Sequence, residues 1–355
     1  MFKDLIIVEL ATVLAGPSVG MFFAELGAKV IKIENRQNGG DVTRSWRSKS
    51  EDKDKKTSAY FSSVNFQKEY VDLDLGKASN YERIVEIIST ADVVISNFKH
   101  QSARKFKVDY DSIKAINPKI IYGQIDGFAH SDRVAYDVVL QAESGFMFMN
   151  GQADSEPTKM PIALIDVLAA HQLKEGLLVA LLKREKTGEG SFVSCSLEEA
   201  ALASLANQAT NFLMNDFVPQ RIGSLHPNIA PYGEIVVTKD GKRLVLAAGS
   251  QPQFKKLCES INAEDVLQNT LFSTNGLRVK NRIELQHALQ AKFGVYIFED
   301  IYSKLLNLNV PVGQIKNLEE VFQTKAAQNL ILEEEIEGEL TKRLKTVVFE
   351  IKSSS

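Results

Sequence analysis

Asp166 has the clearest chemical potential in this sequence, because it places a carboxylate in an otherwise apolar segment, PIALIDVLAAH, that leads into a helix. A carboxylate is ionised at neutral pH without a general base, and a short side chain on a rigid helix start can attack an activated acyl group. An aspartate at a helix start also commonly serves as an N-cap that accepts backbone N–H groups. Spacing alone leaves both interpretations open.

The helix that follows Asp166 is indicated by apolar residues at helical spacing. Lysine and arginine crowd residues 183–186, where the helix dipole favours cations, and Gly188 is typical of the end of a helix. The pattern predicts a helix that begins close to Asp166 and ends near residue 187.

The chain before this helix alternates between short apolar runs and helical lengths. Strands are predicted over residues 5–10, 29–34, 70–75, 93–98 and 120–125, with helices from Pro17 to Gly27 and over residues 79–89. This order predicts an α/β fold with a doubly wound parallel sheet and a binding crevice at the carboxyl ends of the strands. The polar segment of residues 35–56 is expected to be an exposed loop.

The first strand, turn and helix are similar to the start of a dinucleotide-binding domain. The turn, however, reads Gly16-Pro17-Ser18-Val19-Gly20 and lacks the G-x-G-x-x-G order that lets backbone amides approach a pyrophosphate. The sequence therefore argues against a nicotinamide-dependent dehydrogenase.

The chain changes character beyond Leu197. A long helix is predicted over residues 198–214, prolines then punctuate a linker, and Asp240-Gly241 between two apolar runs predicts a β-hairpin. An antiparallel element followed by helices indicates a second, smaller α+β domain.

Composition excludes several classes of function. The net charge of −3 over 355 residues gives no basic excess that would draw the chain to nucleic acid or anionic lipid, so we expect small-molecule partners. Cys195 and Cys258 lie far apart and suggest neither a disulfide framework nor a metal site. Glu9 and Pro17 interrupt the apolar N-terminal stretch, and no signal-peptide pattern is evident. We expect a cytoplasmic protein without a bound metal.

Seven ordered blocks across most of the chain resemble the family III CoA-transferases, the CaiB/BaiF group, which also includes formyl-CoA transferases and the α-methylacyl-CoA racemases. The blocks are LIIVELATVLAGPSVGMFFAELGAKVIKIEN near the start, ADVVISNF from Ala91, INPKIIYGQIDGF from Ile116, AYDVVLQAESG from Ala135, PIALIDVLAAH, LLKREKTGEGSFVSCSLEEA from Leu181 and HPNIAPY from His226.

The resemblance implies a Rossmann-like large domain built from both chain ends, at residues 1–197 and 325–355. It also implies a linker helix region at 198–224, a small domain at 225–324 and an interlocked homodimer. On this reading Asp166 is the nucleophile of a CoA-transferase, forming first a mixed anhydride with the donor acyl group and then an aspartyl-CoA thioester that passes CoA to an acceptor acid.

The resemblance also implies where acyl-CoA binds. The expected contacts are the turn after the first strand, a basic residue after the second, and further residues along the crevice: Val13, Leu14, Ala15, Arg36, Leu73, Asn97, Phe98, Arg104, Lys105 and Tyr136. Arginine suits phosphate and can stack on adenine. For Arg36, Arg104 and Lys105, the alternative is an ordinary solvated surface charge; for Tyr136, it is a packed core tyrosine.

Departures from the family pattern bear on the reaction. Gly249, Ser250 and Gln251 match the glycine-rich lid loop but contain one glycine, and a simple turn is the alternative. The racemases carry a histidine at the position of Tyr136 and a glutamate in the lid segment, so Tyr136 and Gln251 leave racemisation without its acid and base. Leu14 replaces the glutamine of formyl-CoA transferases, which favours a larger or less polar acid than oxalate. A racemase-like enzyme and a non-catalytic CoA-binding protein remain the alternatives.

Overall fold

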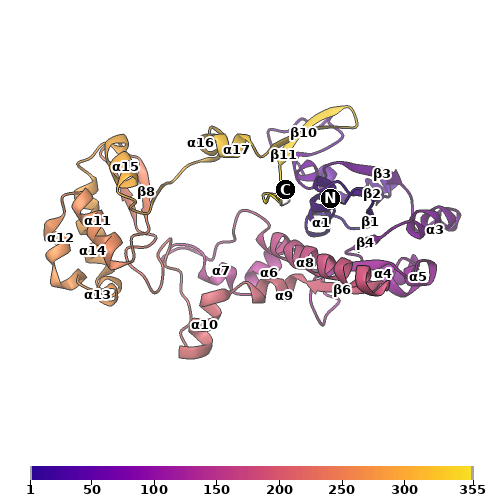
Figure 1. Ribbon diagram of the computed structural model, residues 1–355, viewed down its shortest axis with the longest axis horizontal. Helices are drawn as coiled ribbons and strands as arrows, with labels where there is room; N and C mark the ends of the chain where they lie inside the picture. Colours follow the sequence, from indigo (N-terminus) through magenta and orange to yellow (C-terminus); the bar gives the residue numbers. More distant parts are fainter. Residues whose placement is uncertain (1, 353–355) are drawn as a thin grey trace. The chain divides into compact units, whose positions relative to one another are not determined.

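The structure, a computed structural model, describes residues 2–352 and contains two compact units (Figure 1). Within the described residues, the first unit comprises the chain up to residue 146, residues 159–217 and the chain from residue 328. The second comprises residues 147–158 and 218–327. These limits differ from the domain limits expected from the sequence, because residues 198–217 group with the first unit and residues 147–158 with the second.

The first unit is built on a six-stranded sheet in the order β3-β2-β1-β4-β5-β6, and every neighbouring pair is parallel. Its strands are β1 (Ile6–Glu9), β2 (Lys29–Glu34), β3 (Lys68–Asp72), β4 (Val93–Ser96), β5 (Ile121–Asp126) and β6 (Ser191–Ser196). The chain runs outward from β1 through β2 to β3 and then crosses to β4 on the other side of β1. This places the topological switch point between β1 and β4.

Helices connect these strands. They are α1 (Ala15–Glu25), α2 (Ala59–Ser63), α3 (Tyr81–Ser89), α4 (His100–Lys105), α5 (Tyr110–Ile116), α6 (Asp137–Glu143), α8 (Leu164–Thr187), α9 (Leu197–Ala203) and α10 (Ala206–Asn215), with 3₁₀ turns η1 (Arg36–Asn38), η2 (Val42–Ser45) and η3 (Ala78–Asn80). The long helix predicted over residues 198–214 is therefore two helices, because the chain breaks at residues 204 and 205 and Ala206 has φ 47°.

Alternate residues of the central strands face opposite sides of the sheet. Ile7 and Ile95 pack with α1 and α8 in one hydrophobic core, and Val8 and Val94 pack with α3, α4 and α5 in another. Burial on both faces explains why these strands are continuously apolar. The predicted α/β fold with a parallel sheet is confirmed.

Two local predictions were wrong. Pro17 is the third residue of α1 instead of its first, because the helix already begins at Ala15. The segment of residues 35–56 is not exposed throughout, because Asp41 is fully buried and Arg44 is only 9% exposed. Their charges are compensated by Lys32 and by Glu34, respectively.

The C-terminal hairpin also belongs to the first unit. β10 (Ile331–Ile336) and β11 (Glu339–Leu344) pair antiparallel across the turn at Glu337 and Gly338, which both have positive φ, as a tight two-residue hairpin requires. Glu339 at the start of β11 accepts hydrogen bonds from the backbone of Lys56 and Thr57, so residues from both ends of the chain lie side by side (Figure 1).

The second unit contains the antiparallel sheet β7-β8-β9, with strands β7 (Ile235–Val237), β8 (Arg243–Leu246) and β9 (Val312–Gln314). The predicted hairpin at Asp240-Gly241 joins β7 to β8 and is confirmed. Its helical elements are α11 (Gln251–Ser260), α12 (Glu264–Gln268), η4 (Thr270–Phe272), α13 (Asn275–Lys280), α14 (Arg282–Phe293), α15 (Phe298–Asn307) and α16 (Leu318–Phe322). The short helices α7 (Phe146–Met149) and α17 (Lys325–Gln328) lie where the chain passes between the units.

Within residues 2–352, no helix has the length and apolar character needed to cross a membrane. In the same part of the chain, no cluster of three or more histidine, cysteine, aspartate or glutamate side chains is arranged to hold a metal ion.

Candidate active site

A cavity of about 470 Å³ lies at the carboxyl ends of the central strands in the first unit. It is lined by the turn after β1 (residues 12–15), by residues 97–100 after β4, by residues 125–136 at the end of β5 and in the following loop, and by Asp166 and Leu197. This is the switch point of the sheet, where open α/β sheets bind their ligands. The structure thus brings seven of the predicted site residues to one cavity: Val13, Leu14, Ala15, Asn97, Phe98, Tyr136 and Asp166.

Asp166 is the third residue of α8 and is only 7% exposed. No donor among residues 2–352 forms a hydrogen bond with its carboxylate, so the N-cap interpretation is wrong; the N-cap residue is Ala163. Burial, with a smaller contribution from the charge of Asp137, raises the pKa of Asp166 to about 7. A buried carboxylate without donors, at the wall of a cavity, is poised for chemistry more than for structure.

Asp137, and not Asp166, caps the start of α8. Its Oδ1 accepts the backbone N–H of Ile165 at 2.7 Å, and its Oδ2 accepts the side-chain amide of Gln141 at 2.7 Å. Gln141 in turn accepts the N–H of Met160 at 2.8 Å. This chain of contacts fixes the start of α8, and so it fixes the position of Asp166. Sequence reasoning missed Asp137, because the capping group lies 28 residues upstream.

The turn between β1 and α1 is held from two sides. The side chain of Asn97 accepts the N–H of Thr12 at 3.1 Å and donates to its carbonyl oxygen at 2.9 Å. Asp41 accepts the N–H of Val13, whose φ of 73° lies in the left-handed region. The first N–H groups of a helix lack intrahelical partners and carry the positive end of its dipole, so the start of α1 offers donors to an anionic group in this cavity.

Two tyrosines belong to the surroundings of Asp166. Tyr136 lines the cavity and is 53% exposed, so it is not a packed core residue. Tyr60 of α2 was missed by the sequence analysis. Burial, followed by the charges of Asp166, Asp137 and Asp41, raises the pKa of Tyr60 to about 12, so its phenol stays protonated and can donate a hydrogen bond at neutral pH.

Positively charged and titratable side chains also line the cavity. Lys99 donates to the carbonyl oxygen of Asp132 at 3.1 Å, and His130 lies in the same wall. Arg133 forms a two-point ion pair with Glu143, at 2.7 and 3.1 Å. Lys99 and Arg133 give the cavity cationic atoms that suit a carboxylate or phosphate.

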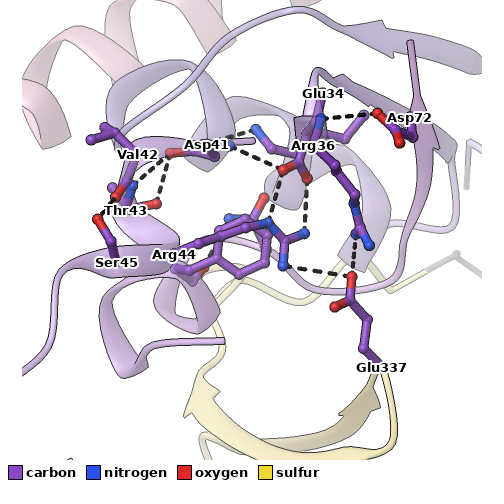
Figure 2. A network of polar contacts seen from close by, with 12 residues as sticks. Glu34, Arg36, Asp41, Val42, Thr43, Arg44, Ser45, Asp72 and Glu337 are labelled. Atoms are coloured by element: carbon purple, nitrogen blue, oxygen red, sulfur yellow. Dashed lines mark hydrogen bonds and ion pairs between the residues drawn. The ribbon is translucent and has the colours of Figure 1, made fainter. Parts of the chain in front are cut away.

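The remaining predicted CoA contacts lie outside the lining of this cavity. The guanidinium of Arg36 forms an ion pair with Glu337 at the tip of the C-terminal hairpin, as Figure 2 shows. Leu73 packs at the edge of the second core. Arg104 and Lys105 are exposed on α4, and Arg104 lines a separate cavity of about 210 Å³.

Gly249, Ser250 and Gln251 belong to the second unit. Ser250 is the N-cap of α11 and forms a capping box with Gln253, and Gln251 is the first helical residue. The carbonyl oxygen of Gly249 accepts a hydrogen bond from the buried Arg278 at 3.0 Å. A Cβ on Gly249 would lie 2.1 Å from a methyl group of Ile229, so this close approach requires glycine.

Comparison with known proteins gives the same family along the whole chain. The profile of CoA-transferase family III matches residues 2–355. The succinate–glutarate CoA-transferase of Agrobacterium fabrum is 35% identical over 340 residues, which cover 94% of this chain and 84% of that protein. The succinyl-CoA:glutarate CoA-transferase of Mus musculus is 34% identical over 324 residues, which cover 89% of this chain and 72% of that protein.

A solved structure agrees. A CaiB/BaiF family protein from Brucella suis matches with a TM-score of 0.83 and 34% identity, covering 98% of this chain and 91% of that one. This chain is a CoA-transferase and belongs to CoA-transferase family III.

Proposed function

We propose that this enzyme transfers CoA from a dicarboxylic acyl-CoA such as succinyl-CoA to a short dicarboxylic acid such as glutarate, with Asp166 as the covalent nucleophile. One observation carries the proposal. A buried carboxylate without hydrogen-bond donors in the described part of the chain stands in the cavity at the switch point of the sheet.

The reaction needs four acyl exchanges. Asp166 attacks the thioester carbonyl of the donor and forms a mixed anhydride, releasing CoA thiolate. The thiolate attacks the aspartyl carbonyl, which frees the donor acid and leaves an aspartyl-CoA thioester. The acceptor carboxylate attacks this thioester and releases the thiolate again. The thiolate then attacks the acceptor's carbonyl in the second anhydride, which yields the new acyl-CoA and regenerates the Asp166 carboxylate.

The surroundings of Asp166 suit this chemistry. With a pKa of about 7, the carboxylate is ionised in about half of the molecules at neutral pH, and it is more basic than an ordinary aspartate. Burial lowers the access of water to the anhydride and the thioester, which hydrolyse readily. Donors at the start of α1 and on Tyr60 and Tyr136 are available to stabilise negative charge on the reacting carbonyl oxygens.

The substrate class rests on two supports. The two relatives described above are named for succinate or succinyl-CoA and glutarate. A dicarboxylic acid keeps one charged carboxylate while the other reacts. Lys99 in the segment after β4 and Arg133 in the segment after β5 line the cavity and can pair with that carboxylate.

The binding of CoA follows from the same reasoning. We assign the pantetheine and thioester region to Val13, Leu14, Ala15, Asn97 and Phe98 at the cavity. The nucleotide end then reaches toward Arg36, Leu73, Arg104 and Lys105, and the segment of Gly249, Ser250 and Gln251 faces the substrate in an interlocked homodimer. A cytoplasmic location fits this chemistry.

The test is the intact mass of the protein after incubation with succinyl-CoA and quenching with borohydride or hydroxylamine. We expect a modification on the peptide that contains Asp166, its discharge by glutarate, and its absence from Asp166→Asn. The matched control is Asp126→Asn, which alters another carboxylate of the same cavity and keeps the adduct. Transfer by Asp166→Asn at the wild-type rate would overturn the proposal. Deuterium uptake at the α-carbon of a 2-methylacyl-CoA without transfer would favour a racemase.

A further inference from the structure

Val13 is held in a conformation that its side chain disfavours. It is β-branched, its φ is 73°, and it lies in the turn that lines the cavity with Asp166. A residue other than glycine in the left-handed region costs about 1–3 kcal/mol and persists only where its surroundings enforce it. The surroundings of Val13 identify the group that does so.

Asp41 is that group. Its two carboxylate oxygens each lie 3.3 Å from the backbone nitrogen of Val13. The backbone and hydroxyl of Thr43 donate to Oδ1 at 3.1 and 2.8 Å, and the ammonium of Lys32 lies 3.1 Å from Oδ2. Figure 2 shows the contacts between Asp41 and Thr43. Every neighbour of the carboxylate is a donor, so an uncharged amide cannot replace it without opposing one of them.

The charge of Asp41 is compensated inside the protein. Lys32 also contacts Glu9 at 2.9 Å and donates to the carbonyl oxygen of Ala11 at 2.7 Å, and Lys68 lies 2.8 Å from Glu9. These two ammonium groups balance the carboxylates of Glu9 and Asp41, and all four side chains are buried. Burial alone would raise the pKa of Asp41, but Lys32 and Thr43 outweigh it and hold that pKa below its usual value.

The network therefore fixes three consecutive backbone positions. Lys32 binds the carbonyl oxygen of Ala11, Asn97 binds both backbone groups of Thr12, and Asp41 binds the N–H of Val13. The next residues, Leu14 and Ala15, begin α1 and line the cavity.

We propose that Asp41 is a positioning residue of the active site, which holds Val13 in the left-handed conformation and so sets the start of α1 against Asp166. The inference rests on the proposed role of Asp166 as nucleophile. Asp41 does not line the cavity and takes no part in the chemistry. Its loss displaces the backbone that receives the reacting thioester, and a displacement of about 1 Å costs on the order of a hundredfold in rate.

The test is a cycle of four proteins: wild type, Asp41→Asn, Val13→Gly and the double variant. Glycine adopts positive φ without a steric cost, so Val13→Gly removes the conformational preference that Asp41 opposes. We expect Asp41→Asn to lower kcat about a hundredfold with little change in the KM for succinyl-CoA. In the Val13→Gly background, Asp41→Asn should lower kcat by at most about tenfold.

Asp240→Asn is the matched control, because Asp240 also accepts a backbone N–H, from Phe298, and a hydroxyl, from Thr238, but lies outside the cavity lining. A kcat for Asp41→Asn equal to that of Asp240→Asn would overturn the inference, as would an equal loss in both Val13 backgrounds. Insoluble Asp41→Asn protein in both backgrounds would assign Asp41 a folding role and overturn it as well. Failure of the proposed function is separate, because wild type itself would then show no adduct at Asp166.

Discussion

At the start of α8, Asp137 caps the helix while the carboxylate of Asp166 faces the cavity. Asp137 accepts the N–H of Ile165 at 2.7 Å, and Asp166, the next residue along the helix, receives no hydrogen bond from the described residues. The capping carboxylate thus satisfies the helix end and leaves the second carboxylate to the cavity. The negative charge of Asp137 also contributes to the raised pKa of Asp166. The helix geometry and the electrostatics of the proposed nucleophile depend on the side chain of Asp137.

Asp137→Asn should move the pH profile of the enzyme. Asparagine keeps an oxygen that can accept the N–H of Ile165 but removes the negative charge, so the pKa of Asp166 falls from its value of about 7. In the proposed mechanism transfer needs the Asp166 carboxylate, so kcat/KM should rise with pH through this pKa, and the acid limb should shift to lower pH in the variant.

The measurement is kcat/KM for succinyl-CoA from pH 5 to 9. Asp126→Asn is the control, because it removes a carboxylate of the same cavity that does not contribute to the pKa shift of Asp166. An acid limb at the same pH in wild type and Asp137→Asn would contradict the assignment.

Asp166→Asn should stabilise the fold at neutral pH. The folded-state pKa of about 7 lies above the ordinary value of 3.8, so folding takes up a proton between these values. The stability contributed by protonated Asp166 is complete below pH 3.8 and is lost as the pH rises through 7. The free energy of unfolding of the variant should therefore increase relative to that of wild type as the pH rises from about 4. This difference should level off above pH 7 at about 4 kcal/mol.

Urea unfolding at pH 5, 6, 7 and 8 measures this difference. Asp109→Asn should show no trend over this range. Hydrogen bonds from Ser112 outweigh burial and hold the pKa of Asp109 below its usual value of 3.8, so Asp109 is ionised in both the folded and the unfolded protein from pH 5 to 8. Equal unfolding free energies for wild type and Asp166→Asn at pH 8 would mean that Asp166 is not buried as a charged group.

The contiguous parts of the site could be predicted from the sequence. Buried strands and helical spacing located the crevice, and the segment PIALIDVLAAH singled out Asp166. Each of these signals lies within a few neighbouring residues, where burial and periodicity act locally.

The rest depends on partners that are distant along the chain. Asp41 sits in a polar segment and is buried only because Lys32 and Thr43 surround it. The cap of α8 comes from 28 residues upstream, which the local N-cap rule does not consider. The guanidinium of Arg36 pairs with Glu337, which lies 301 residues away along the chain. A polar residue whose burial is made possible by a distant charge carries no local pattern.

Arg278→Met should destabilise the second unit. Arg278 is fully buried and donates to the carbonyl oxygens of Ala230 at 2.7 Å and Gly249 at 3.0 Å and to the side chain of Gln251 at 2.7 Å. Methionine fills part of the volume but leaves the carbonyl oxygens of the buried Ala230 and the half-buried Gly249 without this donor, and each buried unpaired group costs about 1–3 kcal/mol. We expect a loss of at least about 3 kcal/mol in the free energy of unfolding.

Urea unfolding of Arg278→Met beside Arg243→Met checks this prediction. Arg243 is exposed on β8, and its replacement should change stability by less than about 0.5 kcal/mol. Arg278→Lys should recover part of the loss, because lysine keeps donors but cannot fork to several acceptors at once. Equal unfolding midpoints for the two methionine variants would contradict the role of Arg278.

Glu337→Gln should strengthen the binding of acyl-CoA if Arg36 receives a CoA phosphate. In the free protein the Arg36 guanidinium pairs with Glu337 at the hairpin tip, and Arg44 is committed to Glu34 through two bonds of 2.8 and 2.9 Å (Figure 2). A phosphate must therefore displace the Glu337 carboxylate from Arg36, and removing that charge should lower the KM for succinyl-CoA about fivefold, the equivalent of about 1 kcal/mol.

The coupling between Arg36 and Glu337 tests whether Arg36 binds a CoA phosphate. Arg36→Met should raise the KM. In that background Glu337→Gln should have little further effect, because Arg36 is absent and Arg44, 3.6 Å from Glu337, is already bonded to Glu34. Glu333→Gln, on the same hairpin and paired with Lys342, should leave the KM unchanged in either background. A higher KM for Glu337→Gln alone would show that the glutamate holds Arg36 in position for the ligand, and equal KM values for wild type and Arg36→Met would remove Arg36 from the CoA site.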